Sequence, residues 1–131
     1  MKIFLSALEN AKAAKCEGGQ PVAKLLVDNN EKLLYNLMSY YYIKGANEQL
    51  AEYIRDHSEL ILIDSGAHSF QFGIKQDWVK YTKEYAEFIK RFDRPNVLGY
   101  FEMDIENVIG YKNVLKLRSI LEAVSDKIIP V

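Results

Sequence analysis

The sequence contains a single cysteine, Cys16, among its 131 residues. One cysteine excludes an internal disulfide and any metal site that this chain would build from a cysteine cluster. An excess of charge of one sign is also lacking, because 17 basic residues stand against 18 acidic ones. Composition therefore gives no reason to expect general electrostatic binding to nucleic acid or membranes, although a local basic patch is not excluded.

Long apolar runs are absent as well. No stretch approaches the roughly 20 apolar residues of a membrane span, and the apolar part of the N-terminal sequence MKIFLSALEN is too short for a signal peptide. We therefore predict a cytoplasmic protein that does not enter a membrane. Neither the glycine-rich dinucleotide fingerprint nor the phosphate-binding P-loop is present, which argues against Rossmann and nucleoside-triphosphatase domains.

Hydrophobic residues make up 49% of the chain, enough to bury a core at this length. Apolar, β-prone runs alternate with segments of helical periodicity. The predicted strands are 2–6, 33–43, 60–63, 97–103 and 127–131, and the predicted helices are 8–16, 20–28, 47–57, 78–92 and 107–124. This alternation is typical of right-handed βαβ units. We predict a single α/β domain over residues 1–131, with a parallel sheet.

Carboxylates end two of the predicted strands. Asp64 closes the third strand, and the fourth supplies Glu102 and Asp104, which at positions i and i+2 are expected to point to one face. If the two strands are neighbours, Asp64 and Asp104 meet at the edge of the sheet where α/β proteins bind ligands. Such a pair could act as acid and base, or accept hydrogen bonds from a polar heterocycle. The alternative is that Asp64 stabilises a turn and Asp104 caps the next helix.

The loop after the third strand also contains His68, which could act as a general base or contact a phosphate. A solvent-exposed loop histidine without such a role is the alternative.

The segment Asp64-Ser65-Gly66-Ala67-His68-Ser69-Phe70-Gln71 resembles, in a stretched form, the Asp-Ser-Gly-Gly-Phe-Gln motif of tRNA-guanine transglycosylases, and also the Asp-Ser-Gly-Ala variants of related phage proteins. The end of the fourth strand, Glu102-Met103-Asp104-Ile105-Glu106, is similar to the family's next strand. The resemblance implies the first half of a (β/α)8 TIM barrel and a pentosyl glycosyltransferase that exchanges guanine for a 7-deazaguanine in RNA or DNA.

The resemblance also implies roles for individual residues. Asp64 matches the proton-transfer aspartate, and Asp104 matches the aspartate that recognises the guanine-type base. The expected substrate-binding residues are Ser65, Gly66, His68, Phe70, Gln71, Glu102 and Asp104. Phe70 or a tyrosine is expected to stack on the base.

The family's nucleophilic aspartate, glycine-rich pocket loop and zinc site lie in the second half of the barrel, whereas this sequence reaches about the fifth strand. We therefore assign no nucleophile, cofactor or metal ligand to this chain. A half barrel has two open sheet edges, so we expect a homodimer or a protein partner that covers them. The alternative function is that of a catalytically inactive binding or inhibitor protein, of viral type, built on a half barrel.

Overall fold

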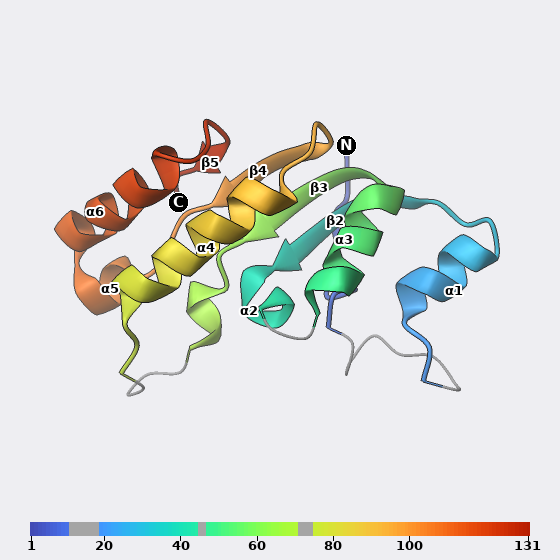
Figure 1. Ribbon diagram of the computed structural model, residues 1–131, viewed down its shortest axis with the longest axis horizontal. Helices are drawn as coiled ribbons and strands as arrows, with labels where there is room; N and C mark the ends of the chain where they lie inside the picture. Colours follow the sequence, from blue (N-terminus) through green and yellow to red (C-terminus); the bar gives the residue numbers. More distant parts are fainter. Residues whose placement is uncertain (11–18, 45–46, 71–74) are drawn as a thin grey trace.

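The computed structural model describes residues 1–10, 19–44, 47–70 and 75–131. Five strands and six α-helices lie in these ranges (Figure 1). The strands are β1 (Leu5–Ser6), β2 (Leu33–Ser39), β3 (Ser58–Asp64), β4 (Val97–Phe101) and β5 (Ile128–Ile129). The helices are α1 (Val22–Asp28), α2 (Tyr40–Ile43), α3 (Glu48–His57), α4 (Trp78–Phe92), α5 (Glu106–Ile109) and α6 (Tyr111–Glu122), and Ala67–Ser69 forms a 3₁₀ turn, η1.

The sheet has the strand order β1-β2-β3-β4-β5, and every neighbouring pair is parallel. Right-handed crossovers that always advance in one direction place their helices on one face of a sheet. Accordingly, α3, α4 and α6 lie over the same face (Figure 1). The strand order never reverses, unlike that of a doubly wound sheet. The predicted fold class is confirmed: an α/β protein whose parallel sheet resembles the first half of a (β/α)8 barrel.

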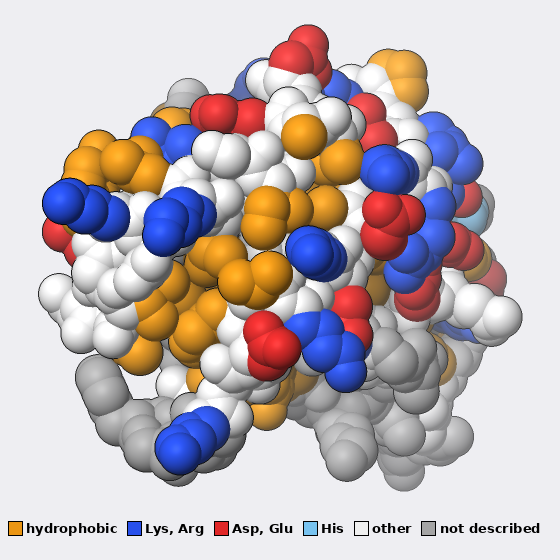
Figure 2. All heavy atoms as spheres, turned by 60° about the vertical axis from the view of Figure 1, so that its left-hand side comes forward, with side chains coloured by type: hydrophobic (Ala, Val, Ile, Leu, Met, Phe, Trp, Pro, Cys, Tyr) orange, Lys and Arg blue, Asp and Glu red, His pale blue; other side chains and the backbone are white. Residues whose placement is uncertain are grey.

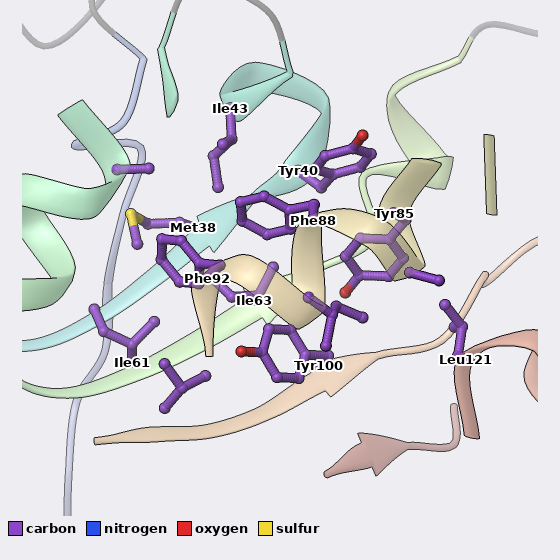
Figure 3. Packing of buried hydrophobic residues seen from close by; sticks show 14 of the residues in the cluster. Met38, Tyr40, Ile43, Ile61, Ile63, Tyr85, Phe88, Phe92, Tyr100 and Leu121 are labelled. Atoms are coloured by element: carbon purple, nitrogen blue, oxygen red, sulfur yellow. The ribbon is translucent and has the colours of Figure 1, made fainter. Parts of the chain in front are cut away.

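The core lies between the sheet and α4. Ile63 pairs in register with Met38 of β2 and with Tyr100 of β4, so the three side chains stand on one face of the sheet. Figure 3 shows the rings of α4 lying against this row, among them Phe88 and Phe92, both fully buried. Burying one such ring contributes about 1.5 to 3 kcal/mol, so α4 holds the sheet in the shape that brings its strand ends together.

Helix α4 has the bounds that its sequence predicts. Tyr81, Tyr85 and Phe88 recur at helical spacing and are all buried. Asp77 caps the N-terminus by accepting a hydrogen bond from the Lys80 N–H at 3.0 Å. Of the tyrosines on the inner side of this helix, Tyr81 contacts the loop that follows β3 and Tyr85 contacts the end of β4.

The second predicted strand, 33–43, is too long. It ends at Ser39, and Tyr40–Ile43 forms the helical turn α2. The reason is packing, since a helical turn places Tyr40 and Ile43 on one side, where both are buried. The Tyr40 ring stacks on Tyr85 at a centroid distance of 5.0 Å. The β-prone composition of this run was overridden by the core.

The predicted helix 107–124 is also wrong in part, because Gly110 divides it into α5 and α6. Gly110 has φ 81° and ψ 156°, a conformation that essentially only glycine adopts. The outer strands β1 and β5 are two residues each, shorter than the predicted 2–6 and 127–131. Most of the predicted helix 8–16 falls outside the described residues.

The sheet residues that alternate with the core row are less well covered. Leu37, Leu60 and Leu62 share the opposite face by register and are only partly buried.

On the helical side, a groove of about 260 Å³ lies between α4 and the α5–α6 segment, and it is lined by Trp78, Val79, Ile109 and Leu117. Figure 2 shows this side of the molecule, with hydrophobic side chains across its middle and charged ones around them.

In the described part of the chain, none of the helices has the length and apolar character needed to cross a membrane.

Candidate functional site

The candidate site is built on the loop that follows β3. Asp64 is the last residue of that strand, and its Oδ2 accepts a hydrogen bond from the Gly66 N–H at 2.9 Å. This contact confirms the expectation that Asp64 stabilises a turn. The carboxylate is partly exposed, and no described residue donates a hydrogen bond to Oδ1. One oxygen therefore orders the loop, and the other is available to a ligand.

Gly66 is required by both conformation and space. Its φ of 74° lies in the left-handed region. A Cβ at this position would lie 2.5 Å from the Tyr41 Cβ and 2.6 Å from the Tyr41 backbone nitrogen. The glycine thus lets the Asp64 loop pack directly against the start of α2. This packing fixes the position of the loop relative to the end of β2.

Ser65 points into the protein and is 1% exposed. Its carbonyl oxygen accepts a hydrogen bond of 2.7 Å from the Tyr81 hydroxyl of α4. Burial, with smaller contributions from Tyr40 and Asp64, raises the pKa of Tyr81 far above its usual range, so the hydroxyl stays protonated as a donor. The side chain of Ser65 therefore lies away from solvent, and its backbone ties the loop to α4.

His68 and Asp104 meet across the ends of β3 and β4. The two strands are neighbours, as predicted from their order. His68 Nε2 lies 3.8 Å from Asp104 Oδ2, and the side chains are 82% and 47% exposed. Asp104 does not cap α5, whose N-cap is Ile105. The structure thus leaves the Asp104 carboxylate partly exposed at the same edge of the sheet as Asp64.

Phe70 packs inside an aromatic cluster. Its ring is perpendicular, within 6°, to those of Tyr41, Trp78 and Tyr81, at centroid distances of 5.2, 5.3 and 5.2 Å. These contacts anchor the end of the loop. Tyr41, 39% exposed, is the most exposed residue of this cluster, whereas Phe70 is only partly exposed. Gln71, also expected in the site, lies outside the described residues.

Glu102 is placed differently from expectation. Because β4 ends at Phe101, the strand alternation that would align Glu102 with Asp104 does not continue. Glu102 is 2% exposed and accepts hydrogen bonds from Arg118 at 2.5 and 2.9 Å and from the Val131 N–H at 2.9 Å. Burial acts to raise the pKa of Glu102, but these hydrogen bonds and the Arg118 charge outweigh it and lower the pKa. Its oxygens are occupied by the protein itself.

Two residues that the sequence did not single out belong to the same edge. Glu9, just after β1, is 1% exposed, and its Oε1 accepts a hydrogen bond from the Ser39 N–H at 2.9 Å. Ser39 is in turn the register partner of Asp64. The sequence offered one indication of Glu9, namely its position. It follows the first predicted strand, as Asp64 follows the third.

One other feature lies outside this site. A wide hollow of about 750 Å³ runs along the outside of α4, but Lys44 and Arg91 at its rim are already paired with Glu84 and Glu48. Among the residues described, no group of three histidine, cysteine or acidic side chains is arranged to hold a metal ion.

Comparison of the chain with protein-family models, with curated proteins and with solved structures found no match. Function is therefore inferred from the motif and from the geometry of the strand ends.

Proposed function

We propose that this chain is a transglycosylase-like domain that binds a guanine-type base at the carboxyl edge of its sheet. In this proposal it serves guanine/7-deazaguanine exchange in nucleic acid, and a complementary half supplies the nucleophile. The observation that carries the proposal is the partly exposed Asp64 carboxylate, of which one oxygen has no hydrogen-bond donor among the described residues, at the edge it shares with Asp104. A free carboxylate at this edge of a parallel sheet is typical of a ligand site.

The roles follow from the chemistry of the two carboxylates. Asp64 transfers the proton that the base gains or loses when its bond to ribose breaks or forms. Asp104 accepts a hydrogen bond from a ring N–H or amino group of the base. His68, beside Asp104, is available to a phosphate of the nucleic acid. Tyr41 provides the exposed ring on which the base stacks.

A binding and exchange assay tests this proposal. Calorimetric titration with guanine should show binding, and Asp64→Asn and Asp104→Asn should each weaken it by about tenfold to a hundredfold, since each removes a charged hydrogen-bond acceptor. The asparagine of the Asp64→Asn variant keeps an oxygen for the Gly66 N–H, so the loop should still fold. Asp56→Asn, near the opposite end of β3, is the matched control and should leave affinity unchanged.

Exchange is then measured with labelled guanine in RNA and in DNA, with the chain alone and with a complementary half. Absence of exchange in every combination would remove the enzymatic part of the proposal. Absence of guanine binding would remove the proposal as a whole.

A second candidate is a catalytically inactive binding protein. It is favoured by the partly exposed Leu37, Leu60 and Leu62, which share one face of the sheet and offer a surface for a protein partner or a second copy. Sedimentation velocity at micromolar concentration measures whether the chain self-associates, and so tests whether this face is an interface between two copies. A folded monomer that binds guanine would count against the partner.

A further inference from the structure

Glu9 is linked to the candidate site through Ser39. The Ser39 N–H donates to Glu9 Oε1, and Ser39 stands opposite Asp64 in the parallel register of β2 and β3. The Ser39 Oγ lies 2.8 Å from the point that a Cβ on Gly66 would occupy. Glu9, Ser39 and the Asp64 loop therefore form one continuous group, contributed by the ends of β1, β2 and β3.

Two atoms of this group are buried without a hydrogen bond. Glu9 Oε2 and Ser39 Oγ are closed off from solvent and have no partner among the described residues. Leaving a buried polar group unpaired costs about 1 to 3 kcal/mol. Two such atoms, on residues that a hydrogen bond links and one of which pairs in register with Asp64, are not explained by stability and indicate a place where a ligand supplies the partner.

The chemical state of Glu9 defines what it offers. Burial, as the largest effect, and the negative charge of Asp64 raise the pKa of Glu9, against the hydrogen bond from Ser39. The Glu9 carboxyl donates a hydrogen bond in its protonated form, which burial favours, and the serine hydroxyl can donate in either case. Asp64, in contrast, accepts hydrogen bonds. The group thus combines donors and acceptors in one place.

We propose that Glu9 and Ser39 form a hydrogen-bond-donating subsite beside Asp64, which contacts the carbonyl oxygen of a flat oxo-heterocycle whose N–H groups are held by Asp64 and Asp104. This assignment rests on the proposed function and names the residues that recognise the carbonyl edge. Both donor atoms are shielded, so contact requires a local displacement of the residues between them and the partly exposed Asp64. A carbonyl next to a ring N–H matches the paired donor and acceptor.

The test is calorimetric titration of the full chain with three probes: guanine, uracil, and 2,6-diaminopurine, in which an amino group replaces the carbonyl. Ser39→Ala should weaken guanine binding about threefold to tenfold, the worth of one hydrogen bond. Glu9→Leu should weaken it by about tenfold or more, whereas Glu9→Gln, which keeps an N–H donor, should stay within about threefold of the natural chain. None of these variants should weaken 2,6-diaminopurine binding.

Melting temperatures are measured in parallel, and Ser39→Ala and Glu9→Gln carry the test if Glu9→Leu does not fold. If guanine binds and Asp64→Asn weakens it, but the Ser39 and Glu9 variants change only the melting temperature, the subsite is a structural water site and the inference is overturned while the proposed function stands. If only uracil binds, and depends on Glu9 and Ser39, the guanine assignment fails and the subsite stands. If no probe binds, both fail.

Discussion

The ends of β3 and β4 lie side by side, yet Asp64 at the first end and Glu102 at the second are used in opposite ways. At the end of β4, Glu102 is buried and both its oxygens accept hydrogen bonds from Arg118 or a backbone N–H. A cavity of only about 20 Å³ lies beside it, room for about one water molecule. At the end of β3, Asp64 Oδ1 accepts no hydrogen bond from a described residue, and the same holds for Oε2 of Glu9, which follows β1. A position at a strand end therefore does not tell whether a carboxylate is structural or available to a ligand. The hydrogen-bond partners of the carboxylate do.

The largest effect should come from breaking the ion pair between Arg118 and Glu102 at the end of β4. Arg118→Met leaves the buried Glu102 carboxylate without its cation, and we expect the melting temperature at neutral pH to fall by roughly 5 to 15 °C. Because the folded-state pKa of Glu102 is lowered, the stability from this pair is present above the unfolded pKa and is lost as pH falls through the folded one. The deficit of the variant should therefore shrink in acid. A deficit that is equal at neutral and acid pH would contradict the role of ionised Glu102.

The next effect concerns the glycine that seats the Asp64 loop. Gly66→Ala adds a Cβ where Tyr41 already lies and forces a left-handed conformation on alanine, so we expect a loss of about 2 to 4 kcal/mol in unfolding free energy. Gly19→Ala is the matched control, with a similar φ of 77° but nothing within 4 Å of the new Cβ, and should cost only about 1 to 2 kcal/mol. Chemical denaturation measures both. Equal losses would show that the contact with Tyr41 is unimportant.

A smaller effect compares one hydroxyl at each strand end. Tyr81→Phe removes the donor to the Ser65 carbonyl, and Tyr85→Phe removes the donor to the Phe101 carbonyl at 3.1 Å. Each should cost about 1 kcal/mol of unfolding free energy. Only Tyr81→Phe loosens the Asp64 loop, so only that variant should also weaken guanine binding. Weakening by both variants would mean that the contact between Tyr85 and the Phe101 carbonyl also positions the site.

The smallest effect is a pH dependence at Glu9. In the unfolded chain this carboxyl ionises near its usual pKa of 4.5, and the folded protein holds the proton to higher pH. Stability is therefore undiminished below the unfolded pKa and is lost as pH rises through the folded pKa. Glu9→Gln cannot ionise and should melt a few degrees above the natural chain at neutral pH but not in acid. Glu59→Gln, at an exposed position, should show no such difference.

The sequence predicted the long-range order of this fold better than its details. Alternating strand and helix patterns were sufficient for the parallel sheet, and the aromatic spacing defined α4 to the residue. The end of β2 was missed because Tyr40 to Ile43 has strand propensity but buries two residues as a helical turn. The break at Gly110 was missed because the dihedral angles of a glycine within a periodic segment cannot be read from the sequence.

For the candidate site, the sequence predicted the placement of two of its carboxylates. Asp64 and Asp104 follow apolar runs, and parallel strands bring such positions to one edge. The sequence contains nothing that pairs Glu102 with Arg118, since that contact depends on how α6 crosses the sheet. Glu9 was overlooked because its burial and its link to Ser39 appear only when β1 and β2 are adjacent.

The unbroken strand order also bears on how such a sheet can be lengthened. Each strand pairs only with the strands before and after it in the chain, so no pairing would have to open for another strand–helix unit to join either side. A sheet with a reversal lacks this property on the side of its first strand. Fusion of a compatible unit to either terminus, or tandem duplication of the gene, would therefore extend the sheet and leave the Asp64 and Asp104 edge in place.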